Sequence, residues 1–168
     1  EDKGWTRVGL LGETPERITD AFPLSDQKNE GGWVRYEPMS DEFDGDALDA
    51  AKWSPIHPRW KGRQPALFWD RNVRVAEGEL QLIMRKEEAP GMPRAQGYHD
   101  YTSAVVISLE KVLYGYFEVR AKPMNSAGSS SFWFAGTADG WRTEIDVFEI
   151  GGAAEGFEYK YNMNLHVF

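Results

Sequence analysis

Acidic and apolar side chains alternate between residues 143 and 150, in the order Thr-Glu-Ile-Asp-Val-Phe-Glu-Ile. The β-branched and aromatic residues of this segment favour a β-strand. Because residues two apart on a strand share a face, Glu144 and Asp146 are predicted to lie on one face. Ile145 and Val147 are then expected on the opposite face, against the core.

Glu149 breaks this alternation, because a regular strand would place its side chain in the core, where an unpaired carboxylate is costly. One extra residue, a β-bulge around positions 147–148, would return Glu149 to the face of Glu144 and Asp146. The spacing Glu-x-Asp-x-x-Glu therefore predicts a bulged strand that presents three acids to one cleft.

The rest of the chain also has the pattern of an all-β protein, with no helical periodicity. A β-hairpin, whose strands alternate between polar and apolar residues, is expected across Ala76, Glu77 and Gly78. Residues 1–32, rich in Gly, Pro and charge, are interpreted as an irregular N-terminal extension, and residues 33–168 as a sandwich of two antiparallel sheets. Further strands are predicted at residues 33–36, 73–75, 79–85, 103–109, 113–122, 130–136 and 157–168.

Composition narrows the function classes. The net charge of −8 argues against nucleic acid as a partner. The chain has no cysteine, hence neither disulfides nor thiolate metal ligands, and no apolar run approaches the length of a membrane span. Seven Trp and seven Tyr are numerous for 168 residues. Aromatic faces stack on sugar rings, although many of these rings are expected simply to fill a β-sandwich core.

Three acids on one face suit the hydrolysis of glycosidic bonds. Mutual repulsion is expected to raise the pKa of at least one of them. One carboxylate can then attack the anomeric carbon while a protonated carboxyl group donates its proton to the leaving oxygen. The alternative is an edge strand with solvated acids. Trp133 and Trp141, which flank the turn before this strand, favour a sugar-stacking cleft.

Further substrate contacts are predicted from position alone. Arg142 lies two residues before Glu144 and is expected on the same face. Trp60 and Arg63, in a Pro- and Gly-containing loop, would supply a stacking face and a fork for a sugar oxygen or sulfate. A surface loop with a packed Trp explains this loop equally well. His166 belongs to the polar face of the last predicted strand, which is expected to join the cleft.

The motifs together resemble a known family. Glu-Ile-Asp-Val-Phe-Glu at 144–149 resembles the catalytic signature of glycoside hydrolase family sixteen in its bulged version. Ala-Lys-Pro-Met-Asn-Ser at 121–126, Ser-Phe-Trp-Phe at 131–134 and Tyr-Thr-Ser at 101–103 are similar to the β-agarase and β-porphyranase branch, which acts on red-algal galactans.

This resemblance implies an endo-acting retaining enzyme that cleaves β-1,4 linkages in porphyran or agarose, with a jelly-roll fold and a concave cleft. It makes Glu144 the nucleophile and Glu149 the general acid and base. Asp146 would hydrogen-bond Glu144 and help keep Glu149 protonated, and Trp133 would stack near the cleavage point. No metal or other cofactor is expected for catalysis, and the location would be secreted, periplasmic or on the cell surface.

Two alternatives stay open. The first is an enzyme of the same family acting on another polysaccharide, an endo-β-1,3-glucanase or a κ-carrageenase. The second is a non-catalytic carbohydrate-binding domain on the same sandwich, although such a domain has no need of three acids.

Length and one acidic turn add two further expectations. Such sandwiches usually fill about 200–250 residues, and this chain stops within a predicted strand. We expect a C-terminal truncation or a second polypeptide that supplies the missing strands. The turn at 40–46, Ser-Asp-Glu-Phe-Asp-Gly-Asp, is rich in oxygen ligands that suit a structural Ca²⁺, although a solvated turn is the favoured interpretation.

Overall fold

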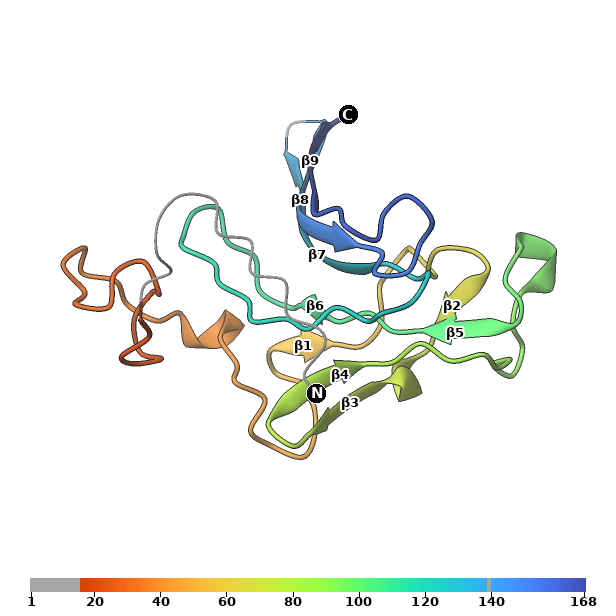
Figure 1. The fold of residues 1–168 in the computed structure, drawn as a ribbon, viewed down its shortest axis with the longest axis horizontal. Coiled ribbons are helices and arrows are strands. Elements are labelled where there is room, and N and C mark those ends of the chain that lie inside the picture. The colour runs from red at the N-terminus through yellow and green to blue at the C-terminus, as the bar shows by residue number, and fades with distance from the viewer. Residues whose placement is uncertain (1–15, 139) are drawn as a thin grey trace. The chain divides into compact units, whose positions relative to one another are not determined.

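The computed structural model describes residues 16–138 and 140–168. The described chain divides into two compact units, one within Gly9–Glu118 and the other within Val119–Phe168. Among the described residues, secondary structure consists of short strands and single 3₁₀ turns (Figure 1), which confirms the all-β class. No described helix is long and apolar enough to cross a membrane.

The described part of the unit Gly9–Glu118, from residue 16 on, contains three two-stranded sheets and three 3₁₀ turns. The sheets pair β1 with β6, β2 with β5 and β3 with β4. The strands are β1 (Trp53–Ser54), β2 (Ala66–Phe68), β3 (Val73–Ala76), β4 (Glu79–Leu82), β5 (Tyr101–Ser103) and β6 (Ile107–Ser108). The 3₁₀ turns are η1 (Glu37–Met39), η2 (Asp70–Asn72) and η3 (Arg94–Gln96).

The predicted hairpin is confirmed: β3 and β4 pair antiparallel from Val73 with Leu82 to Ala76 with Glu79. The turn residues Glu77 and Gly78 both have positive φ, of 60° and 72°, as a tight two-residue hairpin turn requires. The parallel pairing of β2 with β5 was not predicted, because it joins segments more than thirty residues apart in the sequence. The predicted core strand at 103–109 is divided between the ends of β5 and β6.

A buried polar network joins three segments of this unit. Asn72 and Thr102 are the most deeply buried polar side chains described, at 1% and 0% exposure. The Asn72 amide donates to the Thr102 hydroxyl at 2.7 Å, and that hydroxyl donates to Oε1 of Glu87 at 2.8 Å. The network links η2, β5 and the loop after β4, because each buried polar group finds its partner in another segment.

Two predicted strands are wrong. Residues 33–36 and 113–122 are irregular, and many of their side chains are exposed, including Val34, Leu113 and Tyr114. A strand needs a neighbour for its backbone N–H and C=O groups, and in this structure neither segment pairs with a described strand. Glu118 instead accepts hydrogen bonds from the backbone of Leu24 and from Tyr116, and pairs with Arg17, so it ties the described end of the N-terminal extension to the 116–118 segment.

The second unit carries one antiparallel sheet in the order β7-β8-β9 (Figure 1). Its strands are β7 (Ser130–Ala138), β8 (Trp141–Ile150) and β9 (Asn162–Val167). One face holds the rings of Phe132, Phe134, Phe148 and Tyr161, which contact one another with centroids 5.2–6.2 Å apart. These rings form the apolar side of the sheet.

The expectation that Ile145 points into a core is wrong in this structure. Ile145 does lie on the face opposite the acids, but it is 49% exposed, and its cross-strand partner Leu165 is 68% exposed. That end of the apolar face is therefore only partly covered. Alternation determines which face a side chain takes, whereas burial depends on what covers that face.

Candidate active site

The bulge predicted in the acidic strand is present in β8. Against β7, Phe132 pairs with Phe148 and Trp133 pairs with Asp146, so Val147 is the extra residue. Against β9, Asp146 pairs with Asn164 and Glu149 pairs with Asn162, which leaves two residues of β8 opposite one of β9. This register change is what a β-bulge produces.

The three acids therefore share one face of the sheet. Residues directly opposite on antiparallel strands have their side chains on the same side. Glu144 is opposite Ala135 and His166, Asp146 is opposite Trp133 and Asn164, and Glu149 is opposite Ser131 and Asn162. Strands β7 and β9 thus present Trp133 and His166 beside the acids, as the sequence predicted.

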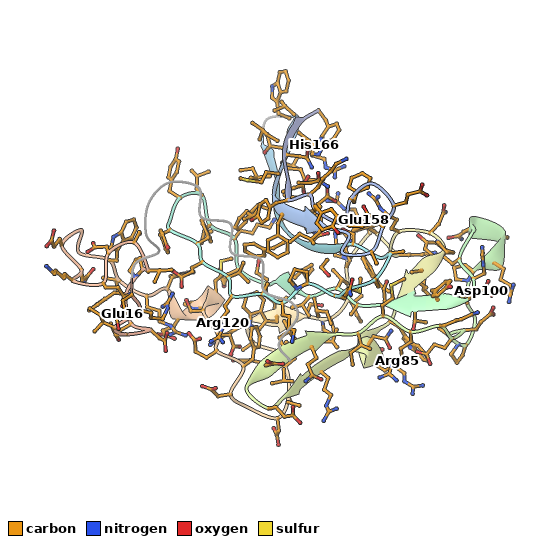
Figure 2. All side chains as sticks on the ribbon, viewed as in Figure 1. Glu16, Arg85, Asp100, Arg120, Glu158 and His166 are labelled. Carbon is orange, nitrogen blue, oxygen red and sulfur yellow. The ribbon has the colours of Figure 1, made fainter. Side chains whose placement is uncertain are left out.

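Each acid has its own polar partner. Nη2 of Arg142 donates to Oε2 of Glu144 at 2.7 Å, and the guanidinium also lies 5.1 Å from the centre of the Phe168 ring. Nε2 of His166 lies 3.1 Å from Oδ2 of Asp146 (Figure 2 labels His166 on β9). These contacts confirm that Arg142 shares the face of the acids.

The residues of the site differ in how deeply they are buried. Asp146 is 5% exposed, Glu144 and Glu149 are half-buried, and Trp133 is half-buried on the same face. The predicted hydrogen bond between Asp146 and Glu144 is replaced by the pair with His166. Nonetheless, a carboxylate oxygen of Glu144, one of Asp146 and a ring nitrogen of His166 all lie within 4.8 Å of one another.

Asn164 is a site residue that the sequence analysis did not single out. Its amide donates a hydrogen bond of 3.1 Å to Oε2 of Glu149. The signal was available in the alternation of β9, which places Asn162, Asn164 and His166 on one polar face. Only the long-range register of β8 with β9 determines which asparagine meets which acid.

Trp60 and Arg63 belong to the other compact unit, so their place beside the acids stays a prediction. The Trp60 ring packs edge-on against Phe68 at 4.9 Å and remains 40% exposed. It contributes to an apolar pocket of about 300 Å³ together with His57, Phe68 and Trp69. Arg63 is exposed.

The acidic turn at 40–46, where a structural Ca²⁺ was suggested, has protein partners for both carboxylate oxygens of one of its acids. The two carboxylate oxygens of Asp41 accept hydrogen bonds from the backbone N–H of Phe43 and the indole N–H of Trp53, at 2.8 and 3.0 Å. Asp49, just after the turn, lies 4.0 Å from the ammonium of Lys52. Within residues 16–138 and 140–168, converging metal-ligand groups occur at Glu144, Asp146 and His166 and not in this turn.

Comparison with known proteins decides the family. Residues 33–168 match the family model described as the GH16 domain of β-porphyranases A–D. The chain belongs to this glycoside hydrolase family. The catalytic signature at 144–149 and its flanking motifs had indicated the same family, so the resemblance is confirmed.

Among the relatives, β-porphyranase E of Zobellia galactanivorans is 35% identical over 145 residues, which cover 81% of this chain and 50% of that protein. β-Porphyranase D of the same species is 33% identical over 140 residues, or 77% of this chain and 33% of its own. The crystal structure of a β-porphyranase from the human gut bacterium Bacteroides plebeius matches with a TM-score of 0.70 and 29% identity, over 80% of this chain and 54% of that one. The chain thus has the fold of these GH16 jelly-roll enzymes and spans about half of their length or less.

Proposed function

We propose that this protein is an endo-acting, retaining β-galactanase that cleaves β-1,4 linkages in porphyran or agarose. The observation that carries the proposal is the bulge at Val147, which brings Glu149 onto the face that already holds Glu144 and Asp146. Family membership supports the hydrolase class, and the named porphyranases support the substrate class.

In the proposed reaction, Glu144 attacks the anomeric carbon and Glu149 donates its proton to the departing glycosidic oxygen. The bond between the anomeric carbon and the leaving oxygen breaks as the bond to the Glu144 carboxylate forms. Glu149 then takes a proton from water, and the resulting attack on the anomeric carbon releases Glu144. The product keeps the anomeric configuration of the substrate.

The partners of each acid fit these roles. The guanidinium of Arg142 attracts the anionic form of Glu144 that a nucleophile needs. Asp146 lies between the two glutamates and is oriented by His166 from the neighbouring strand. Trp133, opposite Asp146, provides an aromatic face for a sugar ring. We further propose that Trp60 and Arg63 contact the polymer away from the cleavage point, and that the enzyme works outside the cytoplasm, where such polymers occur.

Hydrolysis of purified porphyran, agarose, laminarin and κ-carrageenan tests the proposal. We expect oligosaccharides from a red-algal galactan, with the β-configuration retained in the first product observed by proton NMR. An inverted product would contradict the assignment of Glu144 as nucleophile. Digestion of laminarin or κ-carrageenan alone would contradict the substrate class, and binding of galactan without hydrolysis would contradict the enzymatic function.

A further inference from the structure

Two carboxylates of β8 and one imidazole of β9 converge on one face of the three-stranded sheet. One donor atom from each of Glu144, Asp146 and His166 lies within 4.8 Å of the other two. Asp146 is 5% exposed, so one member of this group has very little contact with solvent. The group is more than a pair of neighbouring acids, because it adds an imidazole nitrogen to two carboxylate oxygens.

The sheet holds these three side chains in place before any ligand arrives. His166 is the direct cross-strand partner of Glu144, and Asp146 follows Glu144 at the two-residue spacing that shares a face. The His166 ring also stacks on Phe168, with centroids 5.8 Å apart and planes 12° from parallel. The position of the imidazole is therefore restricted both by the backbone and by an aromatic neighbour.

We propose that Glu144, Asp146 and His166 form a binding site for a transition-metal dication of the Zn²⁺ type. Imidazole nitrogen and carboxylate oxygen are both common Zn²⁺ ligands, and three protein ligands with one open position form a usual zinc site. Bonds of about 2.0–2.2 Å place tetrahedral donors roughly 3.3–3.6 Å apart. The most distant donors in this group need to approach by only roughly 1.3 Å, within reach of side-chain rotation.

The neighbouring contacts are compatible with an ion. Arg142 holds Oε2 of Glu144, and the second carboxylate oxygen remains able to coordinate, since an ionised carboxylate offers about four acceptor positions. The ion would replace the proton shared between Nε2 of His166 and Oδ2 of Asp146. The two carboxylates supply two negative charges to the ion, and Glu144 shares its charge with the Arg142 guanidinium.

The ligand set predicts which ions bind. Ca²⁺ takes six to eight oxygen ligands and Mg²⁺ prefers a hydrated octahedral shell, so a pocket with one nitrogen and two carboxylates suits neither well. Imidazole instead suits Zn²⁺, Cu²⁺ and Ni²⁺. We therefore expect Zn²⁺ to bind and equal concentrations of Mg²⁺ and Ca²⁺ to compete poorly.

The consequence for activity rests on the proposed function. An ion coordinated by Glu144 and Asp146 occupies the carboxylate that is proposed to attack the sugar. The site is thus inhibitory, and a chelator should restore activity. Binding itself needs no substrate and is measured independently of hydrolysis.

Isothermal titration of the purified full-length protein with Zn²⁺ tests the site. Of the three histidines in the chain, the two besides His166 are available as controls. His166→Gln should weaken Zn²⁺ binding at least about tenfold, because loss of even a residue that only orients a metal ligand costs about 10–100-fold. His99→Gln should leave binding unchanged, although His99 also lies beside a carboxylate, with Nδ1 2.9 Å from Asp100. Glu144→Gln should weaken binding as His166→Gln does, and it gives a second measurement if the histidine variant fails to fold.

The outcomes separate the site from the proposed enzyme activity. Saturable Zn²⁺ binding that depends on His166 and Glu144 supports the site, even if no galactan is hydrolysed. Absence of Zn²⁺ binding by the wild-type protein overturns the site, even if galactan hydrolysis is normal. Equal loss of binding in His99→Gln and His166→Gln, or unchanged binding in Glu144→Gln, also overturns it.

Discussion

The side-chain amide of Asn164 donates a hydrogen bond to Oε2 of Glu149, although Asn164 is the cross-strand partner of Asp146. The hydrogen bond runs along the face of the sheet, from one pair of cross-strand partners to the next. It depends on the extra residue in β8, because regular alternation would turn Glu149 to the aromatic face. The bulge therefore connects the backbone register to the placement of the proposed acid.

Deletion of Val147 should be tolerated better than deletion of Phe148. Removing Val147 restores regular alternation and keeps Glu149 on the face of Glu144. Removing Phe148 instead deletes a ring that is 8% exposed and contacts Phe132 and Tyr161, a loss comparable to the about 3–5 kcal/mol of a buried Phe→Ala change. Urea unfolding of both variants measures the difference. Equal destabilisation would show that Val147 is not simply an inserted residue.

The two glutamates should differ in their response to the substrate's leaving group. Glu144→Gln should abolish formation of the glycosyl-enzyme and leave oligosaccharide binding intact. Glu149→Ala should retain activity on aryl glycosides with acidic leaving groups, because such groups depart without a proton. Mass spectrometry of the trapped intermediate and kinetics on a leaving-group series measure these effects. A Glu149→Ala variant that is equally slow on every leaving group would contradict its role as general acid.

Arg142 and Arg63 should affect different kinetic constants. Arg142→Ala should lower kcat on porphyran and agarose alike, because its guanidinium pairs with the proposed nucleophile at 2.7 Å. Arg63→Ala should raise KM for porphyran far more than for agarose, if Arg63 binds sulfate. Loss of a charge-assisted hydrogen bond costs about 1.5–3 kcal/mol, or roughly ten- to a hundredfold.

Steady-state kinetics of both variants on both polymers, at low and high salt, tests this division. Added salt should reduce the Arg63 effect, because ions screen an exposed pair. If Arg63→Ala impairs both polymers equally, the side chain binds ordinary hydroxyl groups or stabilises its loop.

Thr102→Val should destabilise the protein by about 1–3 kcal/mol, although valine has nearly the same shape. The substitution leaves the buried amide of Asn72 without its acceptor and removes a donor to Glu87. Ser103→Ala, at the adjacent position of β5 and outside this network, is the matched control. Thermal unfolding of the two variants measures the difference, and equal midpoints would contradict a stabilising role of the network.

His57 should make stability depend on pH. Its Nδ1 accepts hydrogen bonds from the backbone N–H of Trp60 and Arg59, at 2.8 and 3.3 Å. Burial, with the positive charge of Arg59, lowers the pKa of His57 below its ordinary value of 6.5. A histidine whose pKa falls on folding contributes stability above the ordinary value, and the contribution is lost as the pH decreases through the lowered value.

The thermal unfolding midpoint should therefore decrease as the pH is lowered from 7.5 to 5. His57→Asn should make this decrease smaller. Asparagine offers an acceptor oxygen in place of Nδ1 but does not take up a proton in this range. An identical pH dependence in the variant would show that carboxylates, and not His57, govern the acid side of the profile.

Local pattern predicted those parts of the fold where sequence neighbours interact. The bulge followed from the cost of placing Glu149 in a core, and the hairpin followed from the turn residues Glu77 and Gly78. Pairings between distant segments were not predictable in this way. The parallel contact of β2 with β5 and the meeting of Asn164 with Glu149 depend on tertiary structure, to which alternation is insensitive.

The dependence on tertiary contacts also explains why some predictions were wrong. Residues 113–122 alternate like a strand, yet they lie unpaired and exposed, because propensity supplies no neighbouring strand. Ile145 takes the predicted face but remains half exposed, since coverage comes from other parts of a fold. The substrate-binding role of His166 stays a prediction, and the contact of its ring with Asp146 was not foreseen. The alternation of the strand predicted the face on which His166 lies, whereas its partner depends on the tertiary structure.

The proposed acids, their polar partners and Trp133 all lie on three consecutive strands of one unbroken stretch, β7 to β9. One continuous segment of the chain therefore carries the proposed acids together with their polar partners. Trp60 and Arg63, the residues proposed to recognise the polymer, are encoded well upstream of that segment. We therefore expect that exchange of the upstream segment alone changes polymer preference and leaves the proposed acids in place.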